Sequence, residues 1–215
     1  MKPSVDPQAV KKESEQIILR AGGQICDWLP FIERKNIRPA DEIIGRALIL
    51  NAMLNIHFKA PVHVIEDWIT RNKLTQYLTE REKVLLTKDH DELTEQETTD
   101  LYWYIEALWA LMWVGSLIKD MPFDRSVEDF MASLAPNLQA NDDGSKFSQK
   151  MRIRTYDEIF KMLDLYFRLH WYARNGQLNG YSTDPVSLDI VMERRKSLEW
   201  VLSPDDGWDD VVLNT

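Results

Sequence analysis

The stretch that decides the fold runs from Leu101 to Ile118 and reads LYWYIEALWALMWVGSLI. A helix with apolar side chains on every face is either buried at the centre of a helical protein or inserted in a membrane. Glu106 lies inside the stretch, and a charged side chain within a bilayer costs roughly 2.5 kcal/mol or more. Neither end carries a cluster of basic residues. We therefore expect a central, fully apolar helix over about residues 99–119 of a water-soluble protein that has no membrane partner.

The segments on both sides of this stretch carry helical rather than strand patterns. Thr79 with Glu82, and Thr94 with Glu97, have the spacing of capping boxes, which mark helix N-termini. No run shows the sustained two-residue alternation of a strand. The sequence predicts an all-α helical bundle, with apolar side chains at helical spacing over residues 7–21, 39–56, 61–69, 122–138, 156–174 and 185–202.

The length of the chain indicates one domain. It has 215 residues, and chains of this size bury about 70% of their unfolded surface without help from a disulfide. We expect a single α-helical domain over residues 1–215. The polar stretch 139–146, QANDDGSK, is the one candidate for a weak subdomain boundary.

Charge and cysteine content narrow the class of protein. The chain has 26 Lys and Arg against 35 Asp and Glu, a net charge of −9, which disfavours nucleic acid as a partner because phosphates need a basic face. The single Cys26 cannot form an internal disulfide or a thiolate zinc site, so a cytoplasmic location is expected. No metal or phosphate-loop motif is present, and we expect no cofactor.

Tryptophan is abundant, with eight residues in the chain. Trp103, Trp109, Trp113, Trp171 and Trp200 fall at helical spacing among apolar residues. Aromatic side chains at such positions are typical of a packed core, and core packing is the expected role.

Several polar side chains interrupt the apolar helices. A buried carboxylate needs a cationic or hydrogen-bonding partner, which leaves two interpretations: a structural ion-pair network, or a pocket in which Glu106 acts as acid or base and an arginine holds an anionic ligand. An open cleft at Glu106 would favour the pocket, and an enclosed, paired Glu106 would favour the network. The candidate residues are Glu106, Arg46, Arg168, His170, Arg174, Glu193 and Arg194.

Two acidic stretches are candidate partner-binding surfaces. One lies near the C-terminus, and the other lies between Leu86 and the central stretch. Acidic surfaces speed encounter with basic partners through charge complementarity. The residues concerned are Asp205, Asp206, Asp209, Asp210, Asp89, Asp91 and Glu92.

Short motifs spread over most of the chain match the sequence pattern of one known protein family. The longest are WYIEALWAL at 103–111, RLHW at 168–171 and VMERRKSLEW at 191–200, with shorter matches at 12–15, 46–48, 78–82 and 208–211. Together they resemble a bacterial family described as a domain of unknown function, number 4272. Tyr104 stands where that pattern has arginine. The resemblance implies an all-helical cytosolic protein and brings no catalytic residues with it.

Two classes of function remain open. We expect a non-enzymatic cytosolic protein that binds another protein, in the form of an immunity or antitoxin-type inhibitor of a basic toxin. The alternative is a small-anion or small-molecule binding protein, or an enzyme, that uses the buried Glu and Arg residues. A homo-oligomer with a structural role is a third possibility.

Overall fold

The structure, a computed structural model, describes residues 5–33 and 35–215, and this part of the chain contains helices and no strand. The predicted all-α fold is confirmed. The helices are α1 (Pro7–Arg20), α2 (Ala40–His57), α3 (Val62–Arg71), α4 (Glu80–Leu85), α5 (Glu95–Val114), α6 (Met131–Leu134), α7 (Ser145–Lys150), α8 (Tyr156–Asn179) and α9 (Leu188–Val201), with single turns η1 (Thr75–Tyr77), η2 (His90–Glu92), η3 (Leu138–Ala140) and η4 (Trp208–Asp210).

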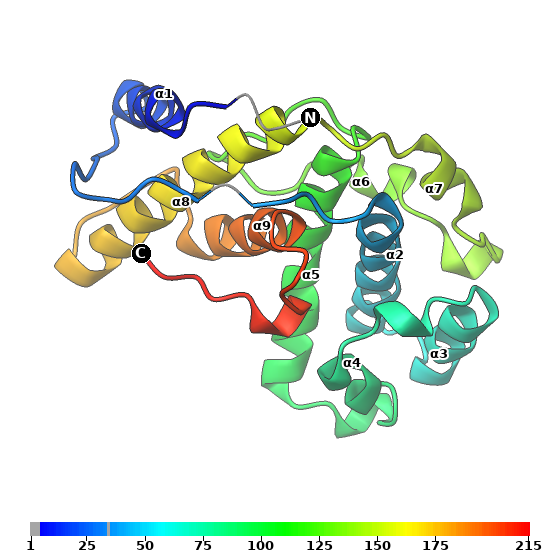
Figure 1. The fold of residues 1–215 in the computed structure, drawn as a ribbon. Helices are drawn as coiled ribbons and strands as arrows, with labels where there is room; N and C mark the ends of the chain where they lie inside the picture. Colours follow the sequence, from blue (N-terminus) through cyan, green and yellow to red (C-terminus); the bar gives the residue numbers. More distant parts are fainter. Residues whose placement is uncertain (1–4, 34) are drawn as a thin grey trace.

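Helix α5 lies in the middle of the fold, between α2 and α9 (Figure 1). It begins at the predicted capping box, where the Thr94 hydroxyl accepts from the Glu97 main-chain N–H. Residues 106–114 are all buried, while Tyr102 is 42% exposed. The central helix is therefore enclosed along its C-terminal half only. Within the described ranges, no helix combines the length and apolarity needed to cross a membrane.

The bounds of the central helix differ from the predicted 99–119. Helix α5 ends at Val114 because Gly115 caps it and Ser116 adopts a positive φ of 57°. The main-chain N–H groups of Arg152 and Arg154 then donate to the Gly115 and Val114 carbonyls at 2.8 and 2.9 Å. A distant segment thus satisfies carbonyl groups at the end of the helix, which a local pattern does not reveal.

Helix α2 is the second core element. Most of it is buried, from Ile43 through Leu54, and it packs along α5. On the other side of α5, α9 packs against α8, and α1 covers the outer side of α8 (Figure 1). The core is therefore a layered stack of long helices, in which α5 and α9 separate α2 from α8.

Most of the helix expected over 122–138 is absent, and only α6 forms there. Main-chain groups of this segment instead bond to side chains from the core: the Pro122 and Arg125 carbonyls accept from Arg194, and the Val127 N–H donates to Glu106. Further along, the Trp68 indole donates to the Asp142 carbonyl at 2.8 Å. The weak boundary suggested at 139–146 stays a prediction.

Candidate functional site

Glu106 forms a buried ion pair with Arg194. The Arg194 Nε and Nη2 atoms lie 2.8 and 2.7 Å from Glu106 Oε2, and the two residues are 0% and 2% exposed, respectively. Arg194 Nη1 also donates to the Tyr166 hydroxyl at 3.0 Å. The pair therefore links α5, α8 and α9, and the Glu106 carboxylate is enclosed and paired.

Arg46 forms a separate buried pair with Glu82 of α4. The contact is bidentate, at 2.7 and 2.5 Å, and Glu82 is 0% exposed. Glu82 Oε2 also accepts from the Thr79 main-chain N–H at 2.9 Å, which completes the predicted capping box. One carboxylate thus caps α4 and neutralises the arginine of α2.

Arg168 pairs within its own helix, since its Nε and Nη2 atoms each lie 2.8 Å from an oxygen of Asp164. In the same helix, His170 Nδ1 contacts Arg195 Nη1 at 2.7 Å. Burial, followed by the charges of Arg195 and Arg174, lowers the pKa of His170 to about 4. His170 is therefore neutral at pH 7 and accepts the Arg195 hydrogen bond.

Two other candidates from the sequence lie apart from these pairs. Arg174 donates to Gln177 Oε1 at 2.5 Å near the surface of α8. Glu193 on α9 is largely buried, and this burial raises the pKa of its carboxyl to about 7, against a smaller opposing effect of Lys196. The predicted polar residues thus form several separate pairs rather than one cluster, and Glu106 does not meet Arg46, Arg168 or Arg174.

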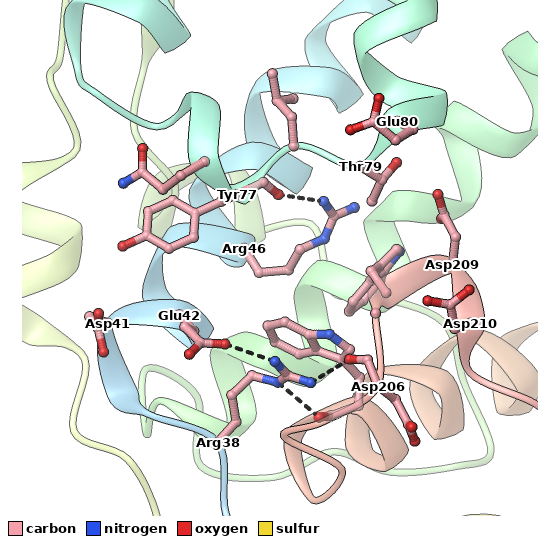
Figure 2. A pocket seen from close by; sticks show the side chains of 15 residues that line it. Arg38, Asp41, Glu42, Arg46, Tyr77, Thr79, Glu80, Asp206, Asp209 and Asp210 are labelled. Carbon is pink, nitrogen blue, oxygen red and sulfur yellow. Dashed lines mark hydrogen bonds and ion pairs between the residues drawn. The ribbon is translucent and has the colours of Figure 1, made fainter.

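A cavity of about 800 Å³ opens where three distant chain segments meet (Figure 2). The N-terminal part of α2 with the preceding Arg38, the turn at 76–80, and the C-terminal residues 206–210 form its walls. We call it the acidic-rimmed cavity. Its lining consists of Arg38, Asp41, Glu42, Arg46, Gln76, Tyr77, Leu78, Thr79, Glu80, Trp200, Asp206, Gly207, Trp208, Asp209 and Asp210.

Two stacked arginine–tryptophan pairs form one side of this cavity. The Arg38 guanidinium carbon lies 4.0 Å from the Trp200 ring centroid, and that of Arg46 lies 4.4 Å from the Trp208 centroid. The two indoles meet edge to face with centroids 5.3 Å apart. Cation–π contacts of desolvated arginine are among the stronger ones, so these contacts stabilise the wall.

Main-chain contacts fix the same wall to the C-terminal segment. Arg38 Nη2 donates to the Ser203 and Asp206 carbonyls at 2.6 and 2.7 Å, and its Nε donates to the Trp200 carbonyl at 3.1 Å. The residues after α9 are thereby held against the start of α2, which brings the C-terminal acids to the cavity.

Carboxylates surround the mouth of the cavity. Figure 2 shows Asp41 and Glu42 on one side and Asp209 and Asp210 on the other. Both lining arginines already have a carboxylate partner, because Glu42 lies 2.7 Å from Arg38 and Glu82 pairs with Arg46. The remaining lining carboxylates therefore give the mouth a negative charge: Asp41, Glu80, Asp206, Asp209 and Asp210.

The two predicted acidic surfaces have different surroundings. Asp206, Asp209 and Asp210 line the cavity, while the neighbouring Asp205 is exposed outside its lining. The second group, at the turn before α5, is exposed and away from the cavity: Asp89, Asp91 and Glu92. Among the described residues, no three His, Cys, Asp or Glu side chains are placed to hold a metal ion.

Sequence reasoning missed Arg38, Glu82 and the contribution of Trp208. The position of Trp208 inside an acidic stretch was the one available signal, because an isolated large apolar residue among charges usually anchors a segment to the core. Trp208 is 4% exposed. Apart from Glu42, four residues along, the partners of Arg38 lie at the other end of the chain, and no local pattern points to them.

Comparison with known proteins gives a family. Neither the curated proteins nor the solved structures contain a match to this chain. The family model described as "Domain of unknown function (DUF4272)" matches residues 10–211, nearly the whole chain, in agreement with the resemblance of its motifs. The chain therefore belongs to the DUF4272 family.

Proposed function

We propose that this protein is a non-enzymatic cytoplasmic protein that binds a basic protein partner at the acidic-rimmed cavity. The observation that carries the proposal is the meeting of carboxylates from three separate chain segments at one cavity, Asp41 and Glu42 from α2, Glu80 from α4 and the C-terminal acids. These acids are distant in the sequence and are brought together by the fold, where they form a concave negative surface.

The charges at the cavity suit a cationic partner. The two lining arginines already pair with Glu42 and Glu82, so they do not neutralise the other carboxylates at the mouth of the cavity, which we call the rim acids. Exposed lysines pair with two of the rim acids, since Lys83 lies 2.5 Å from Glu80 and Lys35 lies 3.9 Å from Asp206, while the charges of Lys196 and Arg81 act on Asp209. Exposed ion pairs contribute little, so a partner's lysine or arginine can replace them.

The charge of the whole chain supports the same class of partner. A net charge of −9 attracts basic proteins over several ångströms and repels nucleic acid. More specifically, we propose that the chain inhibits a basic toxin by binding to its surface, as an immunity protein does. The arrangement of Glu106 supports this class over the alternative enzyme or anion-binding site, because its carboxylate is committed to Arg194.

Titration with a hexa-arginine peptide tests the binding site. Asp209→Asn combined with Asp210→Asn removes two charges from the cavity, and Asp91→Asn combined with Glu92→Gln removes two from the distant turn. We expect the cavity variant to bind the peptide at least tenfold more weakly, and the turn variant to stay within twofold of the parent. Affinity should also fall as salt concentration rises. Equal effects of the two variants, or affinity independent of salt, would refute the proposal.

Co-expression with the products of adjacent genes tests the inhibitor form of the proposal. A basic neighbour should co-purify in a complex that the Asp209→Asn, Asp210→Asn variant fails to form, and its toxicity should return with that variant. If every basic neighbour product stays uncomplexed, the inhibitor form is wrong.

A further inference from the structure

Two buried N–H donors on the wall of the acidic-rimmed cavity have no hydrogen-bond partner among the described residues. They are Trp208 Nε1 and Arg46 Nε. Trp208 is 4% exposed and Arg46 is 1% exposed, and both residues line the cavity. Buried donors are nearly always paired in folded proteins, so two on one wall indicate a place where an acceptor binds.

A second buried indole and the other nitrogens of Arg46 are paired. The Trp68 indole donates to the Asp142 carbonyl at 2.8 Å, and the two terminal nitrogens of Arg46 reach Glu82 and the Tyr77 carbonyl. Arginine N–H donors without a hydrogen-bond partner also occur away from the cavity, at Arg168 Nη1 and Arg195 Nε, so the unpaired indole N–H of Trp208 is what distinguishes this wall. The two unpaired donors of the wall belong to groups stacked 4.4 Å apart, so they lie on neighbouring parts of it.

The rim and the wall place different requirements on a ligand. The rim carboxylates favour a cation and repel an anionic acceptor such as a free carboxylate or phosphate. The wall needs an uncharged acceptor beside that cation. A main-chain carbonyl next to a lysine or arginine side chain supplies both, whereas an inorganic cation or a polyamine supplies only the charge.

We infer that the cavity recognises the main chain as well as the basic side chain of its partner, with Trp208 Nε1 and Arg46 Nε donating to a peptide carbonyl while the rim holds the adjacent lysine or arginine. This inference rests on the proposed function and names the partner segment at that site. Both N–H groups are enclosed in the free protein, so binding requires the Trp208 ring to move relative to Arg46 and admit the carbonyl.

Trp208→Phe tests the inference, because it keeps an aromatic ring beside Arg46 and removes only the N–H donor. Hexa-arginine carries carbonyl groups beside its cationic guanidinium groups, whereas spermine carries cationic amines and no carbonyl. We expect the variant to bind hexa-arginine about three- to tenfold more weakly and to bind spermine as the parent does. The melting temperature of the free variant should equal or exceed that of the parent, because an unpaired buried donor is lost. Trp28→Phe is the control, since Trp28 is 76% exposed and does not line this cavity.

The outcomes separate this inference from the proposed function. If Trp208→Phe binds hexa-arginine as the parent does, while Asp209→Asn with Asp210→Asn binds it weakly, carbonyl recognition is wrong and the basic-partner site stands. If Trp208→Phe weakens spermine and peptide equally, Trp208 only shapes the cavity and the inference is also wrong. If the parent binds neither probe, the proposed function itself fails.

Discussion

Arg46 of the core helix α2 lies under the Trp208 ring of the C-terminal segment, with its guanidinium carbon 4.4 Å from the ring centroid. The same guanidinium forms the bidentate pair with Glu82. One buried cation therefore joins α2, the start of α4 and the segment after α9. These are the parts of the chain that meet at the acidic-rimmed cavity, so the integrity of the cavity depends on this contact.

Glu106→Gln should strongly destabilise the fold. The change leaves the Arg194 guanidinium buried without its counter-charge, and breaking a buried ion pair in this way costs about 3–5 kcal/mol. Urea denaturation measures the free energy of unfolding. The control is Asp124→Asn, whose pair with Arg125 is exposed and should contribute less than about 1 kcal/mol. Equal losses in the two variants would contradict the structural role of Glu106.

His170 should make stability fall in mild acid. Its pKa is about 4 in the fold because of burial and the nearby Arg195 and Arg174, and near 6.5 in an unfolded chain. Below about pH 6.5 the unfolded chain takes up a proton that the folded protein does not. The stability present above that pH is therefore lost as pH falls towards 4.

His170→Gln isolates this effect while keeping an acceptor for Arg195. The variant should lose about 2–3 kcal/mol less than the parent between pH 7 and pH 4.5, measured by denaturant unfolding at both values. Parallel pH profiles for parent and variant would show that His170 does not titrate in this way.

Glu193 should make stability fall as pH rises, which is the opposite of the effect of His170. Burial raises the pKa of its carboxyl to about 7, so stability from the protonated form is present below about pH 4.5 and is lost as pH rises through 7. Glu193→Gln imitates the protonated form and should gain about 1–3 kcal/mol at pH 8 and little at pH 4.5, the lower value applying if water partly screens the carboxylate. The exposed Glu128→Gln serves as the control and should change neither value. A loss of stability at pH 8 would mean that the ionised carboxylate is stabilising.

Gly45→Ala should destabilise the wall of the cavity. A Cβ atom at Gly45 would lie 2.4 Å from ring carbons of Tyr77, whose carbonyl accepts from Arg46 Nη1 at 3.1 Å. Overpacking costs about 1–3 kcal/mol, which outweighs the gain of about 0.5–1 kcal/mol from alanine in a helix.

The Tyr77→Ala background provides a sign test for this contact. Without the ring, Gly45→Ala should stabilise α2 by its helix propensity alone, about 0.5–1 kcal/mol in thermal or urea unfolding. Destabilisation of similar size in both backgrounds would show that the Tyr77 ring does not limit the space at Gly45.

Helix class and several helix starts follow from the sequence, because their causes are local. Thr94 with Glu97 and Thr79 with Glu82 form the capping boxes that their spacing predicts. Local signals failed where distant groups take over the main-chain hydrogen bonds. The segment 122–138 is mostly irregular because Arg194 and Glu106 bond to its main chain, and no periodicity encodes those contacts.

The candidate site could be predicted only in part, because local sequence signals reveal its charges but not the distant segments that complete it. The acidic character of Asp206, Asp209 and Asp210 is visible in the sequence, whereas the cavity that they line requires Arg38 and the turn at 76–80 to be brought to them. The sequence also placed Arg46 beside the apolar core without revealing Glu82 as its partner. A capping-box glutamate is normally at the surface, and Glu82 is 0% exposed because it also pairs with that arginine.

The central claim, that a basic segment binds at the acidic-rimmed cavity and receives a hydrogen bond from Trp208, has a direct test by NMR. The indole N–H signals of the eight tryptophans can be followed in ¹H–¹⁵N spectra, with Trp208 assigned from the Trp208→Phe variant. On addition of hexa-arginine, we predict a downfield shift of the Trp208 indole proton that saturates with the binding curve, while the exposed Trp28 signal stays in place. A Trp208 signal that does not move at saturating peptide would contradict the account.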